Sequence, residues 1–281
     1  MSYYNRRATS AINGNSIRSE TPLTNDQLMR VTPSVFATEA YQDRSAKYAF
    51  TSTIDKIELL RTEGFEPFFA AQSKPRIQDK LGHTKHMVRL RKPGAIQSEV
   101  AEEIVLVNDS SGMTSDIVFF GLFRGVCQNG LIAGSVVNEM RVHHRGNAHD
   151  NVIEGVYTVL DQAGNVAESV DNMKALTLSH DEQRLFATEA LKIRWDEGEA
   201  PIPAQDLLFS RRAADREPTL WNVFNRAQEN LIKGGLHGRN KSSGRTTTRA
   251  INSVNEQVRV NRELWTLADE FAAFRQSRAA A

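Results

Sequence analysis

The sequence predicts an α+β fold, in which a central antiparallel sheet packs against several helices. Residues 80–145 contain consecutive β-rich runs bounded by turn residues, and such runs are typical of strands. Residues 50–64 and 150–275 instead carry apolar residues at helical spacing. We expect these elements to form a single domain over residues 21–275, preceded by a flexible basic arm over residues 1–20.

The composition is that of a globular protein with little net charge. Of the 281 residues, 40% are hydrophobic and 25% are charged, and the formal net charge is +1. This charge gives no global argument for nucleic acid or membrane binding, so any electrostatic argument must be local. The single cysteine excludes an internal disulfide and a cysteine-rich zinc site. We find no signal peptide and no apolar run of roughly 20 residues, and therefore expect a cytoplasmic protein without a membrane partner.

The elements before the sheet follow an arm that is rich in Ser, Asn and Arg and lacks hydrophobic periodicity. Residues 23–29 predict a short helix with Thr24 as its N-cap. Thr53 begins an amphipathic helix that ends at Gly64, because glycine commonly terminates helices. The three phenylalanines and one proline within residues 65–69 predict entry into a strand that packs on the core.

Residues 81–94 (LGHTKHMVRLRKPG) predict a strand with basic side chains. Alternation places Lys85, Arg89 and Arg91 on one face, Lys92 follows them, and the segment contains no acidic residue. Such a strand can set a row of cations against the phosphates of a nucleic acid. The pattern is equally typical of an edge strand whose charges prevent aggregation.

Residues 116–134 (DIVFFGLFRGVCQNGLIAG) predict the central strand and the bend that ends it. The apolar run favours a buried strand, and Cys127-Gln128-Asn129-Gly130 predicts a tight turn. With the basic strand and residues 102–108, this strand completes an antiparallel meander. We expect Cys127 to be a small core side chain, whereas Arg124 and Asn129 could face a ligand.

The histidines near the end of the strand region do not predict a metal site. His143 and His144 are adjacent, so on a strand they point to opposite faces and cannot hold one ion without a bend. His149 and Asp150 lie nearby, but no second carboxylate has ligand spacing. No metalloprotease, phosphate-loop or serine-hydrolase motif occurs. We therefore expect no catalytic residue, metal or cofactor, and a hydrolase that uses the histidines is the weakest hypothesis.

A helix and a cationic segment occupy residues 217–249. Apolar residues at i, i+4, i+7 and i+11 from Leu220 to Leu231 predict the helix, and Gly234-Gly235 predicts its end. The segment LHGRNKSSGRTTTR that follows is predicted as a loop. Residues 226–249 contain six basic residues and one acidic residue. A hydroxyl-rich cationic loop suits phosphate contacts, and the alternative is a solvated surface loop.

Two blocks of the sequence resemble the signatures of a known family. They are GLFRGVCQNGL at residues 121–131 and WNVFNRAQENLIKGG at residues 221–235. RVHH at residues 141–144 and NRELW at residues 261–265 resemble the same family, which is associated with phages and plasmids and is catalogued as a domain of unknown function. The resemblance spans roughly residues 50–270 and implies a mobile-element setting. Fold and setting together also resemble the single-strand annealing proteins of the Rad-fifty-two type.

The leading functional hypothesis is a non-catalytic protein that binds single-stranded DNA and promotes annealing during recombination of a mobile element. Such a protein neutralises the phosphate backbone while the bases stay exposed, so it needs cationic grooves. Its partners would be single-stranded DNA and further copies of the chain, which could form a ring. The predicted DNA-binding residues are Lys85, Arg89, Arg91, Lys92, Arg124, Arg141, Arg145, Arg226, Lys233, Arg239, Lys241 and Arg245.

The competing hypothesis is a protein-binding factor of a phage or plasmid that acts in host takeover or against restriction. It would use the polar face of the predicted helix, which is formed by Asn222, Asn225, Arg226 and Glu229. In that case the basic segments would serve solubility only.

Overall fold

The computed structural model describes residues 11–13, 15–39, 41, 50, 52–74, 78–95, 99–109, 116–125, 129–133, 139–142, 148–161 and 163–279. The contacts of the chain group it into two compact units. Unit 1 contains residues 1–131 and 137–162, and unit 2 contains residues 132–136 and 163–281. The single domain expected over residues 21–275 spans parts of both units.

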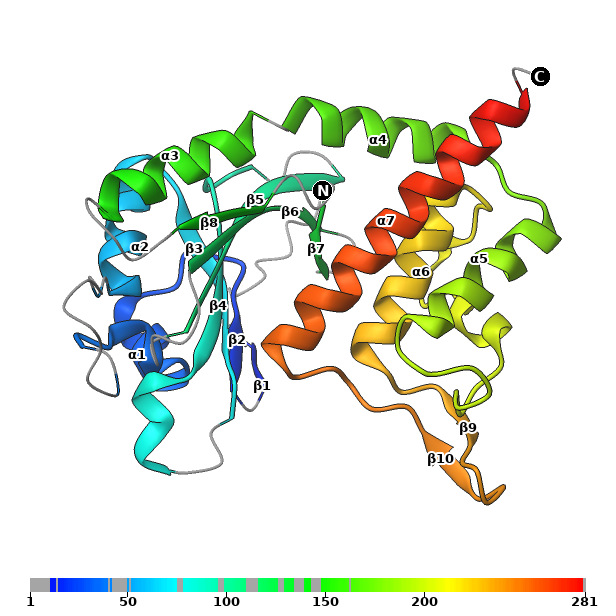
Figure 1. The fold of residues 1–281 in the computed structure, drawn as a ribbon, viewed down its shortest axis with the longest axis horizontal. Coiled ribbons are helices and arrows are strands. Elements are labelled where there is room, and N and C mark those ends of the chain that lie inside the picture. The colour runs from blue at the N-terminus through cyan, green and yellow to red at the C-terminus, as the bar shows by residue number, and fades with distance from the viewer. Residues whose placement is uncertain are drawn as a thin grey trace, which may run out of the picture. The chain divides into compact units, whose positions relative to one another are not determined.

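Unit 1 is built on an antiparallel sheet, as the α+β prediction requires (Figure 1). The strand order is β1-β2-β3-β4-β5-β6-β7, and β8 also pairs with β6. The registered pairs are antiparallel, which confirms the meander expected within residues 80–145. The strands are β1 (Ala11–Asn13), β2 (Ser16–Arg18), β3 (Glu66–Gln72), β4 (Lys85–Arg91), β5 (Val100–Asp109), β6 (Asp116–Arg124), β7 (Asn129–Ile132) and β8 (Glu139–Val142).

The end of the expected amino-terminal arm belongs to this sheet. Residues 16–18 of β2 pair with residues 69–71 of β3. Ile17 is fully buried, so the burial of one apolar side chain fixes a segment that shows no hydrophobic periodicity. Residues 11–13 and 16–18 of the arm therefore form strands and not a flexible tail, whereas residues 1–10 and 14 lie outside the described part.

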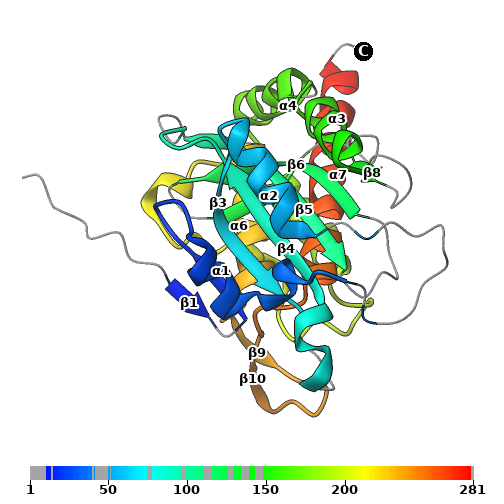
Figure 2. The ribbon, with the colours of Figure 1, turned by 90° about the vertical axis from the view of Figure 1, so that its left-hand side faces the viewer.

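Helices cover one face of the sheet of unit 1, and Figure 2 shows α1 and α2 lying across it. Thr24 caps α1 as predicted, because its hydroxyl accepts a hydrogen bond from Gln27 N (3.3 Å) and Gln27 Oε1 accepts one from Thr24 N (2.9 Å). Gly64 follows α2 with φ +83°, which a glycine adopts without strain. The described helices are α1 (Asn25–Val31), α2 (Thr53–Thr62) and α3 (Ala148–Leu160), with the 3-10 helices η1 (Pro33–Phe36) and η2 (Gln78–His83).

A buried polar cluster connects η1 and α2 to the sheet. The imidazole of His86 on β4 is fully buried, with Nδ1 3.0 Å from Ser34 Oγ and Nε2 2.8 Å from Thr53 Oγ1. Asn108 Nδ2 on β5 donates to the same Thr53 hydroxyl at 2.7 Å. Burial lowers the pKa of His86 to about 4, so the ring is neutral at neutral pH and can donate from one nitrogen and accept at the other.

From residue 163 onward, the described part of unit 2 consists of helices and one β-hairpin (Figure 1). The predicted loop over residues 236–249 contains this hairpin, in which Arg239 lies opposite Arg245 and Thr247 lies opposite His237. None of the described helices combines the length and apolar character that crossing a membrane requires. The elements are α4 (Ala163–Ala175), α5 (His180–Lys192), η4 (Ala204–Leu208), η5 (Ala213–Asp215), α6 (Leu220–Lys233), β9 (His237–Arg239), β10 (Arg245–Thr247) and α7 (Val254–Ala279).

The helix α6 is the buried centre of unit 2. The apolar face predicted from Leu220 to Leu231 is fully buried, and the Phe224 ring lies 5.8 Å from Trp221 and 5.9 Å from Trp265 between ring centroids. The polar residues between them are buried as well. A helix that is buried on all sides has to satisfy its polar side chains within the protein, because an unpaired buried polar group is costly.

Candidate nucleic-acid interface

The basic strand β4 lies inside the sheet of unit 1, between β3 and β5. Alternation places Arg89 and Arg91 on one face as predicted, but they are only 4% and 2% exposed. Arg89 Nη1 lies 3.2 Å from Glu103 Oε2, and Arg91 Nη1 lies 2.8 Å from Glu103 Oε1. Both guanidinium groups are therefore paired with one buried carboxylate of β5, and they do not form an open row of phosphate contacts.

Aromatic rings and backbone carbonyl groups of unit 1 complete the surroundings of these arginines. The Arg91 guanidinium lies 4.0 Å from the ring centroids of both Phe68 and Phe123. Arg89 also donates to the carbonyl oxygens of Leu131 (3.0 Å) and Gly130 (3.2 Å), which connects it to β7. Burial lowers the pKa of both arginines, and the charge of Glu103 opposes this shift.

The remaining predicted DNA-binding residues of unit 1 differ in their exposure to solvent. Arg124 is buried and pairs with Glu99 at 2.9 Å, so it does not face a ligand as expected. Lys85 is half-buried, and Lys92 is exposed with its ammonium group 5.3 Å from the Phe65 ring centroid. Arg145, Cys127, His143 and His144 lie outside the described residues, as do the side chains of Arg141, Asn129, His149 and Asp150.

The polar face of α6 is also buried, which corrects its predicted role as a binding surface. Asn222, Asn225, Arg226 and Glu229 are all within the interior of unit 2. Arg226 donates to Leu208 O and to Gln183 Oε1, each at 3.2 Å. These side chains hold other segments of the chain in place, and they offer neither phosphate contacts nor a surface for a partner.

Several cations that are open to solvent lie on or next to the hairpin β9–β10 of unit 2. Arg239, Lys241, Arg245 and Arg249 are all exposed, and residues 237–249 contain no acidic residue. Figure 1 shows the hairpin extending from the end of α6, beyond the neighbouring helices of the same unit. The hairpin therefore presents guanidinium and ammonium groups in a form that suits phosphate oxygens.

A side chain shapes the turn of the hairpin. Asn240 Oδ1 accepts hydrogen bonds from Ser242 N (3.1 Å) and Gly244 N (2.8 Å), and Arg239 Nη1 donates to Ser243 O at 2.9 Å. Asparagine favours such turns because its short side chain replaces a backbone acceptor. Lys241, at the tip, forms an ion pair with Glu199 although its own side chain is 74% exposed. A surface pair of this kind is weak, so a phosphate can compete for the lysine.

The base of the hairpin is anchored to the rest of unit 2. Arg239 N donates to Pro201 O at 2.8 Å, and a Cβ atom added at Gly238 would lie 2.0 Å from that same oxygen. On the other side, Thr248 exchanges backbone hydrogen bonds with Gly235 N (2.8 Å) and Leu236 O (2.9 Å). The hairpin is thus a fixed extension of the core, and only its distal half lacks such anchoring among the described contacts.

Additional arginines surround the end of α6, from which the hairpin begins. Arg194 donates to Leu231 O and to Arg249 O, each at 2.5 Å, and Arg211 Nη2 donates to Gly234 O at 2.6 Å. These bonds satisfy carbonyl groups that a helix leaves unpaired at its carboxyl end, where positive charge is favourable. Arg194 and Arg211 were not predicted as site residues, because nothing in their local sequence indicates a role at the end of a distant helix.

Lys233 occupies the same end of α6 but is already paired. Its ammonium group lies 2.8 Å from Glu229 Oε1, and Arg212 contacts the same carboxylate at 2.7 Å. Burial favours a raised pKa for Glu229, but the hydrogen bonds from Arg212 and Lys233 outweigh it and leave the pKa lowered. Lys233 therefore balances a buried carboxylate and is a weaker anion ligand than the hairpin cations.

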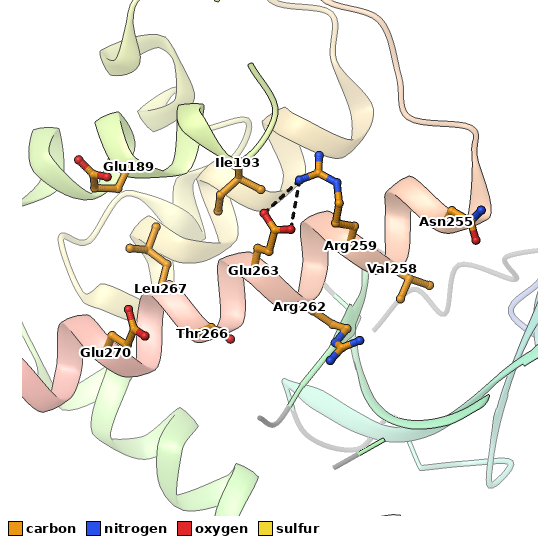
Figure 3. A pocket seen from close by; sticks show the side chains of 10 residues that line it. All are labelled: Glu189, Ile193, Asn255, Val258, Arg259, Arg262, Glu263, Thr266, Leu267 and Glu270. Carbon is orange, nitrogen blue, oxygen red and sulfur yellow. Dashed lines mark hydrogen bonds and ion pairs between the residues drawn. The ribbon is translucent and has the colours of Figure 1, made fainter. Parts of the chain in front are cut away.

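Unit 2 also contains a groove of ≈ 540 Å³ between α5 and α7 (Figure 3). Its wall combines apolar residues such as Ile193 and Leu267 with charged ones. Arg259 is held there by Glu263 (3.0 Å) and by Glu256 (2.5 Å), and the hydrogen bond that it donates to Glu256 raises its pKa further above the usual value. The paired charges make this groove a poorer site for an anion than the hairpin.

The described residues contain no group of three or more His, Cys, Asp or Glu side chains placed to hold a metal ion. The expected absence of a metal, a cofactor and a catalytic residue stays a prediction, because residues 143–147 lie outside the described part. His86, which alternation along β4 places on the face opposite Arg89 and Arg91, is a neutral structural histidine.

The family of the chain follows from comparison with known proteins. Residues 40–265 match the model of a domain of unknown function, DUF932. The chain belongs to this family. Two members of the UPF0380 proteins, YafZ and YfjQ of Escherichia coli (strain K12), are each 43% identical to it over 255 residues, which is 91% of this chain and 93% of each relative. No solved structure matches the chain.

Proposed function

We propose that this DUF932 protein binds single-stranded DNA non-catalytically, through phosphate contacts of the β9–β10 hairpin. The observation that supports the proposal is the exposure of Arg239, Lys241 and Arg245 on a hairpin that contains no acidic residue. Arg239 and Arg245 are cross-strand partners, so their side chains leave the same face of the ribbon. Two guanidinium groups on one face can contact neighbouring phosphates of one strand.

Annealing is the finer part of the proposal. Two complementary strands repel each other through their phosphates, and cations that neutralise one backbone without covering its bases lower that repulsion. The hairpin has this character, because beyond the cations its exposed side chains are polar and include no Phe, Tyr or Trp. Recombination of a phage or plasmid is the setting proposed for this activity.

Self-association is proposed together with annealing. The net charge of the chain is only +1, so one copy has little attraction for a long polyanion. Several copies that place their hairpins along one path would concentrate positive charge there, and a ring is the arrangement that closes such a path. The size of the protein in solution, with and without single-stranded DNA, tests this part.

The competing proposal is a protein-binding factor that acts in host takeover or against restriction. The surface that we expected to bind a protein partner is not available, because the polar residues of α6 are buried. We therefore rank it below DNA binding.

Fluorescence anisotropy with a labelled single-stranded oligonucleotide at several salt concentrations tests the proposed function. Each phosphate contact contributes about −0.7 to the slope of log K against log salt for single strands, so Arg239→Gln with Arg245→Gln should reduce the slope by about 1.4. A matched control is Arg30→Gln with Arg184→Gln, which removes the same charge from exposed positions on α1 and α5. This control should keep the slope of the unaltered protein.

Two outcomes contradict the proposal. One is the absence of binding by the unaltered protein at about 50 mM salt, where attraction to phosphates is strong. The other is an equal change of slope in both double variants, which would mean that only total charge matters and that the hairpin is not the site.

A further inference from the structure

We infer that Phe209 is a base-stacking residue of the single-strand binding surface, so that the ligand must carry unpaired bases. This inference rests on the proposed function and adds to it a contact with a nucleobase. Aromatic side chains beside a cationic surface are how proteins that bind single strands without sequence preference hold the bases.

The Phe209 ring is exposed and has no ring or cation partner among the described residues of the protein. It is 59% exposed, and among the described residues it makes no aromatic or cation–π contact. Two other exposed aromatic side chains of the described part have a hydrogen-bond or cation–π partner. Tyr157 donates a hydrogen bond to Glu63 Oε2 (2.5 Å), and the Arg278 guanidinium lies 5.8 Å from the Phe274 ring centroid.

The backbone that carries Phe209 is fixed by buried side chains of α6. Asn230 Nδ2 donates to Leu207 O and to Phe209 O, each at 2.9 Å, and Arg226 Nη1 donates to Leu208 O at 3.2 Å. Three consecutive carbonyl groups are thus held by two residues of the interior. A ring presented in this way loses little conformational freedom when a ligand binds, which favours affinity.

Phe209 lies close to the base of the hairpin. Arg211, two residues further on, spans the last turn of α6, because its guanidinium contacts both Asn230 Oδ1 (2.9 Å) and Gly234 O (2.6 Å). Asn230 and Gly234 are separated by about 6 Å along the helix axis. Gly235 and Leu236 connect Gly234 to β9, so all these groups belong to one end of unit 2.

This arrangement indicates a path for one strand of nucleic acid. Its phosphates would contact Arg239 and Arg245 on the hairpin, and a base further along would stack on the Phe209 ring. Every base has an aromatic face, so the contact would be tolerant of sequence. A base within a duplex is already stacked on both sides, so this contact selects unpaired bases.

The test compares Phe209→Ala with Phe209→Trp on two ligands, a single-stranded oligonucleotide and an abasic strand of equal length. Replacing a stacking residue by alanine should weaken binding of the normal strand by roughly five- to a hundredfold, and tryptophan should retain it. Binding of the abasic strand should not change in either variant, because only phosphate contacts remain. Phe274→Ala on α7 is the matched control and should leave both affinities unchanged. Thermal unfolding should match that of the unaltered protein in each case, since the exposed ring contributes little to the core.

The outcomes separate this inference from the proposed function. If the unaltered protein binds neither strand, the proposed function fails and the inference fails with it. If it binds both strands and Phe209→Ala changes neither affinity, the stacking role is wrong while phosphate binding by the hairpin stands. An equal loss on both strands also rejects stacking, because a base contact cannot weaken binding of a strand without bases.

Discussion

The strand β4 and the hairpin β9–β10 carry the same kind of sequence and have opposite environments. Each places arginines close together on one face of a β-ladder, with no acidic residue in its own segment. On β4, Arg89 and Arg91 are buried against Glu103, whereas Arg239 and Arg245 of the hairpin are exposed. The difference lies in the neighbouring strand. β5 supplies a carboxylate at the facing position, and no third strand pairs with β9 or β10 among the described residues.

This comparison shows that a run of basic residues does not by itself indicate a surface for polyanions. A guanidinium can be buried when a carboxylate and aromatic rings surround it, although the desolvation cost makes such a pair a weak source of stability. A cation that stays exposed to solvent is available to bind a phosphate. Whether a basic strand can bind a polyanion therefore depends on whether the adjacent strand carries carboxylates that pair with its cations.

The largest effect is expected for Glu103→Gln, which removes the carboxylate shared by the two buried arginines. Leaving buried charges unpaired should lower the free energy of unfolding by about 3–5 kcal/mol. A urea titration followed by far-ultraviolet circular dichroism measures this loss. Tryptophan fluorescence would not report on unit 1, because Trp195, Trp221 and Trp265 all lie in unit 2. Glu102→Gln, at the neighbouring exposed position, is the control and should cost less than about 0.5 kcal/mol. Similar losses in both variants would show that the ion cluster is not what distinguishes β4.

A smaller effect is expected for Gly238→Ala at the base of the hairpin. The added methyl group would lie 2.0 Å from Pro201 O, a backbone atom, so the hairpin must shift and lose its anchoring hydrogen bond. We expect a loss of about 1–3 kcal/mol in unfolding free energy, and weaker DNA binding because the cations lose their fixed position. Gly244→Ala is the control, since its nearest neighbours are atoms of the Asn240 side chain at 3.3 Å or more. DNA binding that survives Gly238→Ala unchanged would mean that the anchoring of the hairpin is irrelevant to its cations.

The smallest effect, with the opposite sign, is expected for Glu199→Gln. This change removes the ion pair that occupies Lys241 at the tip of the hairpin. Because surface ion pairs contribute about 0–1 kcal/mol, the affinity for single-stranded DNA should rise by at most about fivefold. The anisotropy titration used for the arginine variants measures this gain, and a fall in affinity would show that Lys241 is not part of the DNA contact.

The helices and strands can be predicted from their own residues. The environment of each side chain cannot, because it depends on residues that are distant in the sequence. Thr24 and Gly64 mark helix ends through their own chemistry, which is why these boundaries are confirmed. Whether Arg89 is buried and paired depends instead on Glu103, which lies fourteen residues further along the chain and on another strand. Alternation places a side chain on a face of the sheet, but it cannot tell whether that face is covered.

The candidate site was predicted in part for the same reason. Arg239, Lys241 and Arg245 are found on the surface, because a segment of glycine, serine and cations has no apolar residue to bury. Arg226 resembles a surface residue in the sequence of α6, but it is buried and bonded to Leu208 and Gln183, which precede the helix. Phe209 and Arg211 could not be assigned in advance, because their positions depend on hydrogen bonds to a helix that follows them.

The two glycines at the end of α6 determine where the hairpin leaves the core. Gly234 and Gly235 have φ values of +62° and +82°, and a Cβ atom at Gly234 would lie 2.6 Å from the backbone of Thr248 and Arg249. The segments that leave and re-enter the core therefore lie in close contact at this point. The tip at Lys241 is about 20 Å away along the strand, so a side chain at Gly234 that tilted the base of the hairpin by about 10° would move the tip by about 3.5 Å. A residue that touches none of the cations can thus set where they are presented.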